Sequence, residues 1–264
     1  MKKNDSKLET KTNGSRSPRR KQKKDVDEKK PVAAVKTPKK KSVAASNSSP
    51  KKTTLSARKQ LVALAIDALK KEYPVPKCAL EYRMPFELLV AVVLSAQCTD
   101  KRVNMVLPGL FQRFPGVEAF AKAPVEEIEE AIQTCGLYRS KAANLSKTAK
   151  ALVEKYDGIV PSSFEELVSL PGIGRKTANC VLGVAFGIAS GFVVDAHVLR
   201  LSQRIGFSDE TTPEKVEDDL NRLTPREEWI DLSHRLIYLG RQYCAARSPQ
   251  CETCPLASFC LKRL

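Results

Sequence analysis

The segment from Leu170 to Lys176, Leu-Pro-Gly-Ile-Gly-Arg-Lys, contains residue types that can hold an anion. Its proline and its two glycines, Gly172 and Gly174, favour a tight turn that exposes backbone N–H groups. A helical pattern begins at Arg175, and the unpaired N–H groups at the start of a helix attract negative charge. The segment therefore predicts a phosphate-binding turn between two helices, although Pro-Gly-x-Gly also occurs in ordinary interhelical turns.

Lys176 falls in the first turn of the helix predicted over residues 175–186. The positive end of the helix dipole disfavours an ammonium group there, and a neutral lysine amine is a nucleophile that forms a Schiff base with a carbonyl-like carbon. An ordinary surface lysine is the alternative, and Lys176 alone does not exclude it. The candidate chemistry is covalent catalysis by an amine.

Asp195 ends an apolar run and stands at the N-cap position of the helix predicted over residues 196–204. The side chain can serve as a cap and nothing more. Alternatively, its carboxylate lies where two helix starts converge and faces a positive charge that develops on a sugar. The two histidines of the chain, His197 and His234, are interpreted as structural residues.

Four cysteines near the C-terminus have the spacing C-x6-C-x2-C-x5-C. Four thiolates this close together can bind a [4Fe–4S] cluster or a structural zinc ion, and their spacing does not separate the two. These candidate ligands are Cys244, Cys251, Cys254 and Cys260. The other four cysteines show no such spacing and are interpreted as ordinary buried or half-buried thiols: Cys78, Cys98, Cys135 and Cys180.

Helical periodicity runs through the chain from Ser56 onward, and no alternating strand pattern stands out. Short connections rich in Pro, Gly and Ser separate the segments, and the apolar segment 86–97 is long enough for a buried helix. The sequence therefore predicts an all-α fold. In addition to the helix that begins near Ser56 and the helix over residues 86–97, predicted helices cover residues 100–113, 124–134, 139–156, 163–169, 175–186, 196–204, 213–222 and 226–239.

Residues 1–54 hold 18 of the 45 basic residues and 5 of the 30 acidic residues, so they carry +13 of the net charge of +15. They contain no aromatic residue and cannot bury enough apolar surface to offset the entropy of ordering. We expect a disordered basic tail that adds salt-dependent attraction to nucleic acid. A tail that only solvates the protein is the alternative.

The N-terminus lacks the apolar core of a secretory signal, and no apolar run approaches the roughly 20 residues that span a bilayer. We therefore expect an intracellular protein, in the bacterial cytoplasm or nucleoid, or in the nucleus if eukaryotic, with no membrane partner. In such a compartment metal binding or free thiols account for eight cysteines better than a disulfide framework does.

Five motifs occur in an order that resembles the endonuclease III family of the helix-hairpin-helix-GPD superfamily. The resemblance covers roughly residues 57–262. The motifs are Leu-Ser-Ala-Gln-Cys-Thr-Asp at 94–100, Gly-Leu-Tyr-Arg-Ser-Lys-Ala at 136–142, Leu-Pro-Gly-Ile-Gly-Arg-Lys-Thr-Ala-Asn at 170–179, Val-Asp-Ala-His at 194–197, and the four terminal cysteines.

The resemblance implies a two-lobed fold with a [4Fe–4S] cluster. One domain is a helical barrel over residues 78–192, which contains the helix-hairpin-helix; the other is an iron-sulfur cluster domain made of residues 55–77 and 193–264. It also implies a monomeric DNA glycosylase that removes oxidised pyrimidines from double-stranded DNA. An AP lyase activity then nicks the strand 3′ to the abasic site by β-elimination.

The same resemblance implies roles for individual residues. Lys176 is the catalytic amine and Asp195 its carboxylate partner. Gln97 and Leu137 enter the space left by the flipped nucleotide. The remaining implied DNA contacts come from Gly172, Gly174, Arg175 and Arg247.

Three other interpretations stay open at this level. A monofunctional glycosylase would lack the catalytic lysine, so the presence of Lys176 counts against it. A non-catalytic DNA-binding module would keep the hairpin glycines and the cysteines without needing Lys176 and Asp195 together. A DNA-binding protein with a structural zinc ion in place of the cluster would lack the broad visible absorption of a [4Fe–4S] protein.

Overall fold

The computed structural model describes residues 53–264, and this part of the chain is helical with no β-strand. The predicted all-α fold is therefore confirmed. The basic tail predicted over residues 1–54 lies outside the described residues except for its last two, Thr53 and Thr54. Thr54 is the N-cap of the first helix, because its side chain accepts a hydrogen bond from the backbone N–H of Ala57.

The helices agree closely with the predicted segments. Their bounds are α1 Leu55–Glu72, α2 Pro85–Ser95, α3 Asp100–Arg113, α4 Val117–Lys122, α5 Val125–Ile132, α6 Tyr138–Tyr156, α7 Phe164–Ser169, α8 Arg175–Phe186, α9 Ala196–Ile205, α10 Pro213–Leu223, the 3₁₀ helix η1 Arg226–Glu228 and α11 Trp229–Gln242. Helix α4 was not predicted, because its six residues make fewer than two turns and show no clear period.

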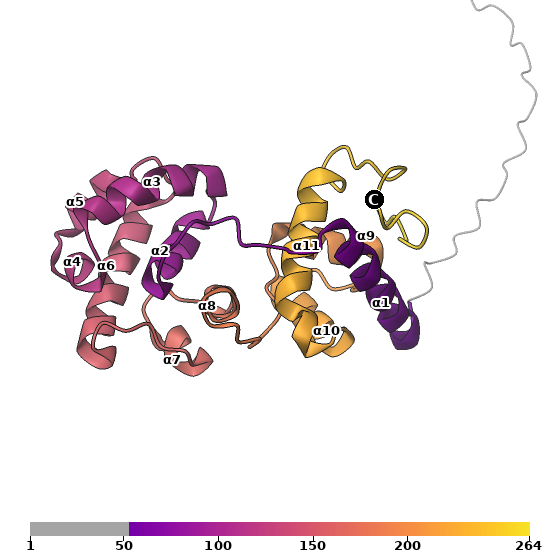
Figure 1. Ribbon diagram of the computed structural model, residues 1–264, viewed down its shortest axis with the longest axis horizontal. Coiled ribbons are helices and arrows are strands. Elements are labelled where there is room, and N and C mark those ends of the chain that lie inside the picture. Colours follow the sequence, from indigo (N-terminus) through magenta and orange to yellow (C-terminus); the bar gives the residue numbers. More distant parts are fainter. Residues whose placement is uncertain (1–52) are drawn as a thin grey trace, which may run out of the picture. The chain divides into compact units, whose positions relative to one another are not determined.

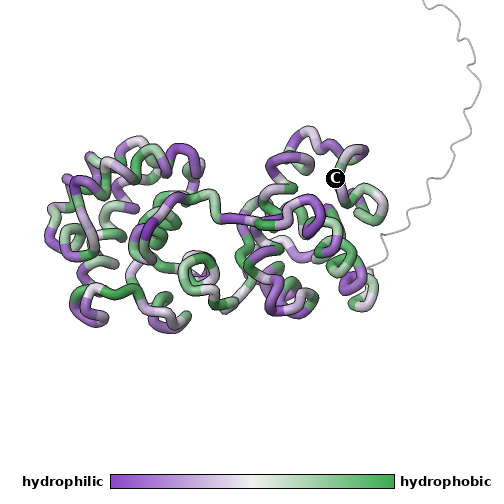
Figure 2. The backbone as a smooth tube through the Cα atoms, in the orientation of Figure 1, coloured by the Kyte–Doolittle hydropathy of each residue, from purple (hydrophilic) through white to green (hydrophobic). Residues whose placement is uncertain are grey.

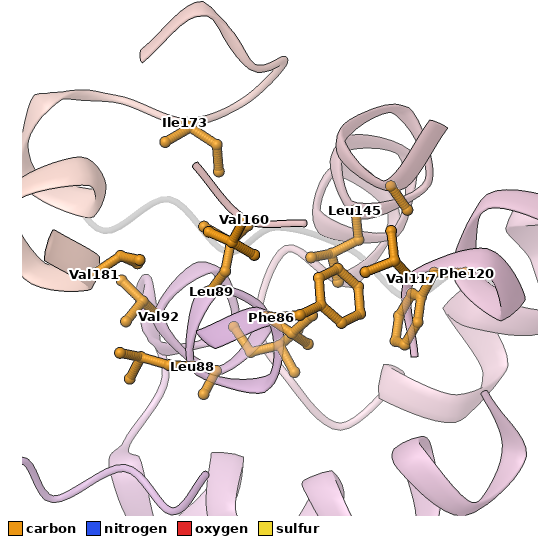
Figure 3. Close-up of a cluster of buried hydrophobic side chains, with 14 of the residues drawn as sticks. Phe86, Leu88, Leu89, Val92, Val117, Phe120, Leu145, Val160, Ile173 and Val181 are labelled. Carbon is orange, nitrogen blue, oxygen red and sulfur yellow. The ribbon is translucent and has the colours of Figure 1, made fainter. Parts of the chain in front are cut away.

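The helices from α2 to α8 enclose one hydrophobic core. At its centre the rings of Phe86 and Phe120 meet edge to face, with centroids 5.4 Å apart and planes at 78°. Figure 3 shows these two rings together with Val117 and Leu145, which come from neighbouring helices. Helix α2 is nearly all buried, as its apolar sequence predicts. The loop that follows α2 is therefore anchored to this core.

A second hydrophobic core joins α1 to α9, α10 and α11. Figure 1 shows α1 beside these C-terminal helices, although more than 120 residues separate them in the sequence. Hydrophobic and hydrophilic residues alternate along most of the helices in Figure 2, as expected for amphipathic helices that bury one face. None of the helices among the described residues is long and apolar enough to cross a membrane.

The chain passes from the second core to the first through the segment between α1 and α2. Tyr238 on α11 holds this segment, because its hydroxyl donates to the carbonyl of Lys77 at 2.7 Å and accepts from the Lys77 N–H at 3.0 Å. The segment also contributes Lys77 and Cys78 to a pocket that α8 and α11 line from other sides.

Candidate active site and DNA-binding surface

Helix α7, a short turn and helix α8 form the predicted hairpin. Helix α6 supports the turn, because the hydroxyl of Thr148 donates to the carbonyl of Pro171 at 2.6 Å. Gly172 has a φ of +79°, a conformation that favours glycine, and a Cβ built there would lie 2.7 Å from Cγ of Asn144. Gly174 has extended backbone and is the N-cap of α8. The hairpin therefore depends on a glycine at position 172 but not at 174.

We expect Gly172→Ala to lower the free energy of unfolding by about 2–5 kcal/mol. A left-handed φ costs an L-residue about 1–2 kcal/mol, and overpacking against Asn144 adds about 1–3 kcal/mol. Gly174→Ala is the matched control, because no atom lies within 4 Å of a Cβ at that position. Urea titration of the two variants checks this, and equal losses of stability would contradict the assigned role of Gly172.

Lys176 is exposed in the first turn of α8, as predicted, and lines a pocket with room for about 190 Å³. Asp195 lines the same pocket from the start of α9. The Cys180 thiol lies one turn further along α8, and burial together with the nearby Cys78 raises its pKa to about 12. The charge of Lys176 opposes this rise in the pKa, and the charge of Asp195 adds to it. The structure thus brings the predicted amine and carboxylate to one pocket.

Asp195 also caps α9. Its Oδ1 accepts the backbone N–H of Val198 at 2.8 Å, which is the N-cap geometry expected from the sequence. The same side chain therefore performs the structural role and faces the pocket, so the two interpretations of Asp195 are compatible. The cap fixes the position of the carboxylate relative to the pocket.

The histidines near this pocket favour their neutral forms. Burial lowers the pKa of His234, which lines the pocket, while Asp231 and Asp195 oppose that shift. Burial also lowers the pKa of His197, whose ring nitrogen Nδ1 lies 3.1 Å from the Arg200 guanidinium. These contacts support their interpretation as structural residues.

An ion pair lines the pocket and was not predicted from the sequence. Arg241 on α11 donates to Asp100 at the start of α3 at 2.5 Å, and both residues line the pocket. The pair joins a helix of the second core to a helix of the first. Asp100 lies within one of the quoted motifs, whereas no motif singles out Arg241.

Gln97 and Leu137 are exposed on neighbouring loops with unusual backbone conformations. Their φ angles are +52° and +58°, in the left-handed region that costs a residue with a side chain about 1–2 kcal/mol. The loops touch, because a Cβ built on Gly136 would lie 3.0 Å from the carbonyl oxygen of Gln97. Backbone strain of this kind is enriched at functional sites, so these two positions are candidates for a functional role.

Lys141 lies beneath these two loops and was not predicted from the sequence. Its amine donates to the carbonyl of Leu94 at 2.8 Å, and only 4% of the residue is exposed. Burial lowers the pKa of Lys141. This bond ties the first turn of α6, which follows Leu137, to the end of α2, which precedes Gln97.

Arg175 is engaged with protein groups. Its Nη2 donates to Glu217 at 2.9 Å, and its guanidinium carbon lies 5.3 Å from the centroid of the Phe164 ring. Glu217 also accepts from Asn179 at 3.0 Å. These contacts tie the start of α8 to α10, and the predicted contact of Arg175 with DNA stays a prediction.

The four C-terminal cysteines line one apolar pocket between α9, α11 and the final loop. Among residues 53–264 no three potential metal-ligating side chains converge on a point that would hold a single ion. A [4Fe–4S] cluster is surrounded by its cysteines, since each binds a different iron. The residues present fit that arrangement. The cysteines are Cys244, Cys251, Cys254 and Cys260.

Hydrogen-bond donors approach the sulfur atoms in this pocket. Arg204 donates to Sγ of Cys244 at 3.4 Å and to the carbonyl of Ala245 at 2.8 Å. The backbone N–H of Lys262 donates to Sγ of Cys260 at 3.4 Å. Such donors stabilise anionic sulfur, which is the form that binds iron. The predicted DNA contact Arg247 is exposed on the loop between the first two cysteines.

Comparison with known proteins gives two family matches. Residues 90–226 match the model described as "HhH-GPD superfamily base excision DNA repair protein". Residues 244–260 match the "Iron-sulfur binding domain of endonuclease III", and this match begins and ends at a cysteine of the predicted ligand set.

Curated relatives and solved structures agree with these matches. Endonuclease III of Synechocystis is 49% identical over 206 residues, which cover 78% of this chain and 94% of the relative. Endonuclease III of Bacillus subtilis is 46% identical over 200 residues, covering 75% and 91%. A trapped endonuclease III–DNA covalent intermediate has a TM-score of 0.74 at 46% identity and covers 77% of this chain and 96% of that one. A thermostable thymine-DNA glycosylase has a TM-score of 0.67 at 26% identity, covering 77% and 94%.

Proposed function

Because the chain belongs to the endonuclease III family of base excision DNA repair enzymes, we propose that Lys176 is its catalytic amine and Asp195 the carboxylate partner. The resemblance predicted from the motifs is confirmed, and the enzyme is a DNA glycosylase for oxidised pyrimidines with AP lyase activity. The observation that supports the two residue roles is that Lys176, in the first turn of α8, and Asp195 line one pocket.

The reaction needs one nucleophile and one stabilising charge. The neutral amine of Lys176 attacks the anomeric carbon of the damaged nucleotide, the bond from this carbon to the base breaks, and the base leaves with the bonding electron pair. Asp195 stabilises the positive charge that develops on the sugar. Ring opening gives an imine, removal of the C2′ proton breaks the C3′–O bond, and the strand is nicked 3′ to the lesion.

The proposed substrate is a duplex, bound by one monomer of the enzyme, in which the damaged pyrimidine or the abasic nucleotide is flipped into the pocket. Gln97 and Leu137 fill the vacated space, since an amide can bond to the orphaned base and an apolar side chain can wedge into the stack. Their exposure and left-handed backbone support this role. We further propose that backbone phosphates contact Gly172, Gly174, Arg175 and Arg247.

The enzyme carries a [4Fe–4S] cluster. We propose that its ligands are Cys244, Cys251, Cys254 and Cys260, as supported by their common pocket. When bound, the cluster supplies the covalent connection that holds the final loop, and with it Arg247, against α9 and α11.

Two features of the organisation are also proposals. The hydrophobic cores support a barrel domain of residues 78–192 and a cluster domain of residues 55–77 and 193–264. The bacterial origin of the curated relatives named above supports a site of action in the bacterial cytoplasm at the nucleoid.

The basic tail is proposed to supply much of the non-specific attraction to DNA. Residues 1–54 carry +13, whereas the rest of the chain carries only +2. Because each released counterion adds to the salt dependence of binding, we expect deletion of residues 1–54 to flatten the slope of log affinity against log salt concentration. Fluorescence anisotropy with undamaged duplex measures the slope, and equal slopes with and without the tail would contradict the proposal.

Borohydride reduction tests the proposed reaction directly. We expect a covalent protein–DNA complex with a duplex that contains thymine glycol or an abasic site, because borohydride reduces the imine to a stable amine. The control is the same duplex with an undamaged pyrimidine, which should give no complex. Efficient base release without any trapped complex would indicate a monofunctional glycosylase instead.

A further inference from the structure

Two thiols belong to the loops that carry Gln97 and Leu137. Cys98 directly follows Gln97, and Cys135 lies two residues before Leu137. The backbones of the loops are in contact at Gly136, since a Cβ built on this glycine would lie 3.0 Å from the Gln97 carbonyl oxygen. The thiols thus belong to segments that are 37 residues apart in sequence and adjacent in space.

The two sulfur atoms and the Lys141 amine form one cluster. Burial, and then the charge and hydrogen bonding of the Cys98 sulfur, raise the pKa of the Cys135 thiol to about 11, while the charge of Lys141 opposes this. Reciprocally, the charges of both sulfurs oppose the lowering of the Lys141 pKa by burial. The bond from Lys141 to the Leu94 carbonyl at 2.8 Å fixes the amine in this position.

We propose that Cys98 and Cys135 are an oxidisable dithiol, which a peroxide converts into a reversible disulfide that joins the two loops. Cys98 is half-buried, whereas Cys135 is only 1% exposed, so Cys98 meets the oxidant first. Cys135 then acts as the resolving thiol. This pair is separate from the four cysteines near the C-terminus and from the Cys78 and Cys180 thiols of the active-site pocket.

The reaction balances with one molecule of peroxide. The Cys98 thiolate attacks one peroxide oxygen, an S–O bond forms, the O–O bond breaks, and an alcohol or water leaves. The Cys135 sulfur then attacks the Cys98 sulfur, the S–S bond forms, and the S–O bond breaks. Water leaves and carries the Cys135 proton. The two thiols lose two electrons in total, and the peroxide gains them.

The disulfide would change the conformation of the loops that carry Gln97 and Leu137. Its effect on DNA binding rests on the roles proposed for these two residues. A disulfide holds its sulfur atoms about 2.05 Å apart, closer than two thiols approach without a bond. Because the loops already touch at Gly136, drawing the sulfurs together displaces the neighbouring residues from their left-handed conformations. We expect the oxidised enzyme to bind an abasic-site duplex at least about threefold more weakly than the reduced enzyme.

Peptide mapping of the full-length holoenzyme tests the disulfide itself. Trypsin separates the two cysteines, because they fall in the peptides 84–101 and 123–139. After mild peroxide treatment and alkylation of the remaining thiols, we expect these two peptides to be linked and a thiol reductant to separate them. Visible absorption of the cluster is followed throughout, so that the dose leaves it intact. Sulfinic acid at either cysteine without the linked peptide would overturn the proposal.

Variants then connect the cross-link to binding. Cys98→Ser and Cys135→Ser should each abolish the linked peptide and the peroxide effect on affinity, while their reduced forms bind like the reduced wild type. Both variants keep the Cys78 and Cys180 thiols of the active-site pocket, so a peroxide effect on affinity that persists in either variant would come from those thiols and would contradict the proposal. A complete cross-link with unchanged affinity would overturn the proposed effect on binding. Failure of the proposed catalytic roles would instead appear in borohydride trapping by the reduced enzyme.

Discussion

Lys176→Arg is expected to eliminate the borohydride-trapped complex and to lower strand cleavage at an abasic site by about 10³-fold or more. The arginine keeps the positive charge at the start of α8, so attraction of the DNA phosphates is preserved. A guanidinium stays protonated and cannot form the imine. The loss should therefore appear in the rate of the chemical step, and affinity for an abasic-site analogue should change little.

The pocket offers a matched control, because Lys77 lines it as well. Lys77 belongs to the segment between α1 and α2 and does not lie at a helix start. We expect Lys77→Arg to trap and cleave at close to the wild-type rate. Single-turnover cleavage and trapping of the two variants on the same duplex provide the measurement. A covalent complex that survives Lys176→Arg and disappears with Lys77→Arg would assign the nucleophile to Lys77.

Most of the architecture could be predicted because the helices are amphipathic and are separated by helix-ending residues. The start of α8 at Arg175 was predicted to the residue, since the hairpin glycines mark it, and this also placed Lys176 in the first turn. Helix α4 escaped prediction because it is too short to show a period. Local sequence signals therefore predict the position of the Lys176 amine better than they predict a short helix such as α4.

The parts of the site that could not be predicted depend on contacts between distant segments. Lysine is rarely buried, so nothing in the sequence indicates that Lys141 holds the Leu94 carbonyl. Gln97 and Leu137 are not glycines, so the sequence gives no sign of their left-handed backbone. Arg175 has the expected position at the hairpin, but only the fold shows that it meets Glu217 on α10.

Asp195→Asn is expected to lower the rate of base removal by about 10²-fold while leaving the stability of the enzyme nearly unchanged. Asparagine caps helices about as well as aspartate, so the bond to the Val198 N–H is kept. The negative charge is lost, and with it the stabilisation of the positive charge on the sugar. This substitution therefore separates the two roles of Asp195.

Asp195→Ala removes both roles and is expected to lower the free energy of unfolding by about 0.5–2 kcal/mol in addition to the rate. Thr54→Ala is the matched control for cap loss, because Thr54 caps α1 and is absent from the pocket. It should lower stability by a similar amount with no effect on single-turnover base removal. Thermal unfolding and single-turnover kinetics on a thymine glycol duplex give the two quantities.

The comparison between the two Asp195 variants decides what the carboxylate does. If Asp195→Asn retains the wild-type rate while Asp195→Ala loses it, the cap alone positions the site and the charge is dispensable. If both variants lose the same rate, the charge is the catalytic contribution and the cap only holds it in place. The geometry favours the second result, because the cap bond fixes Oδ1 at 2.8 Å from the Val198 nitrogen while the residue lines the pocket that contains Lys176.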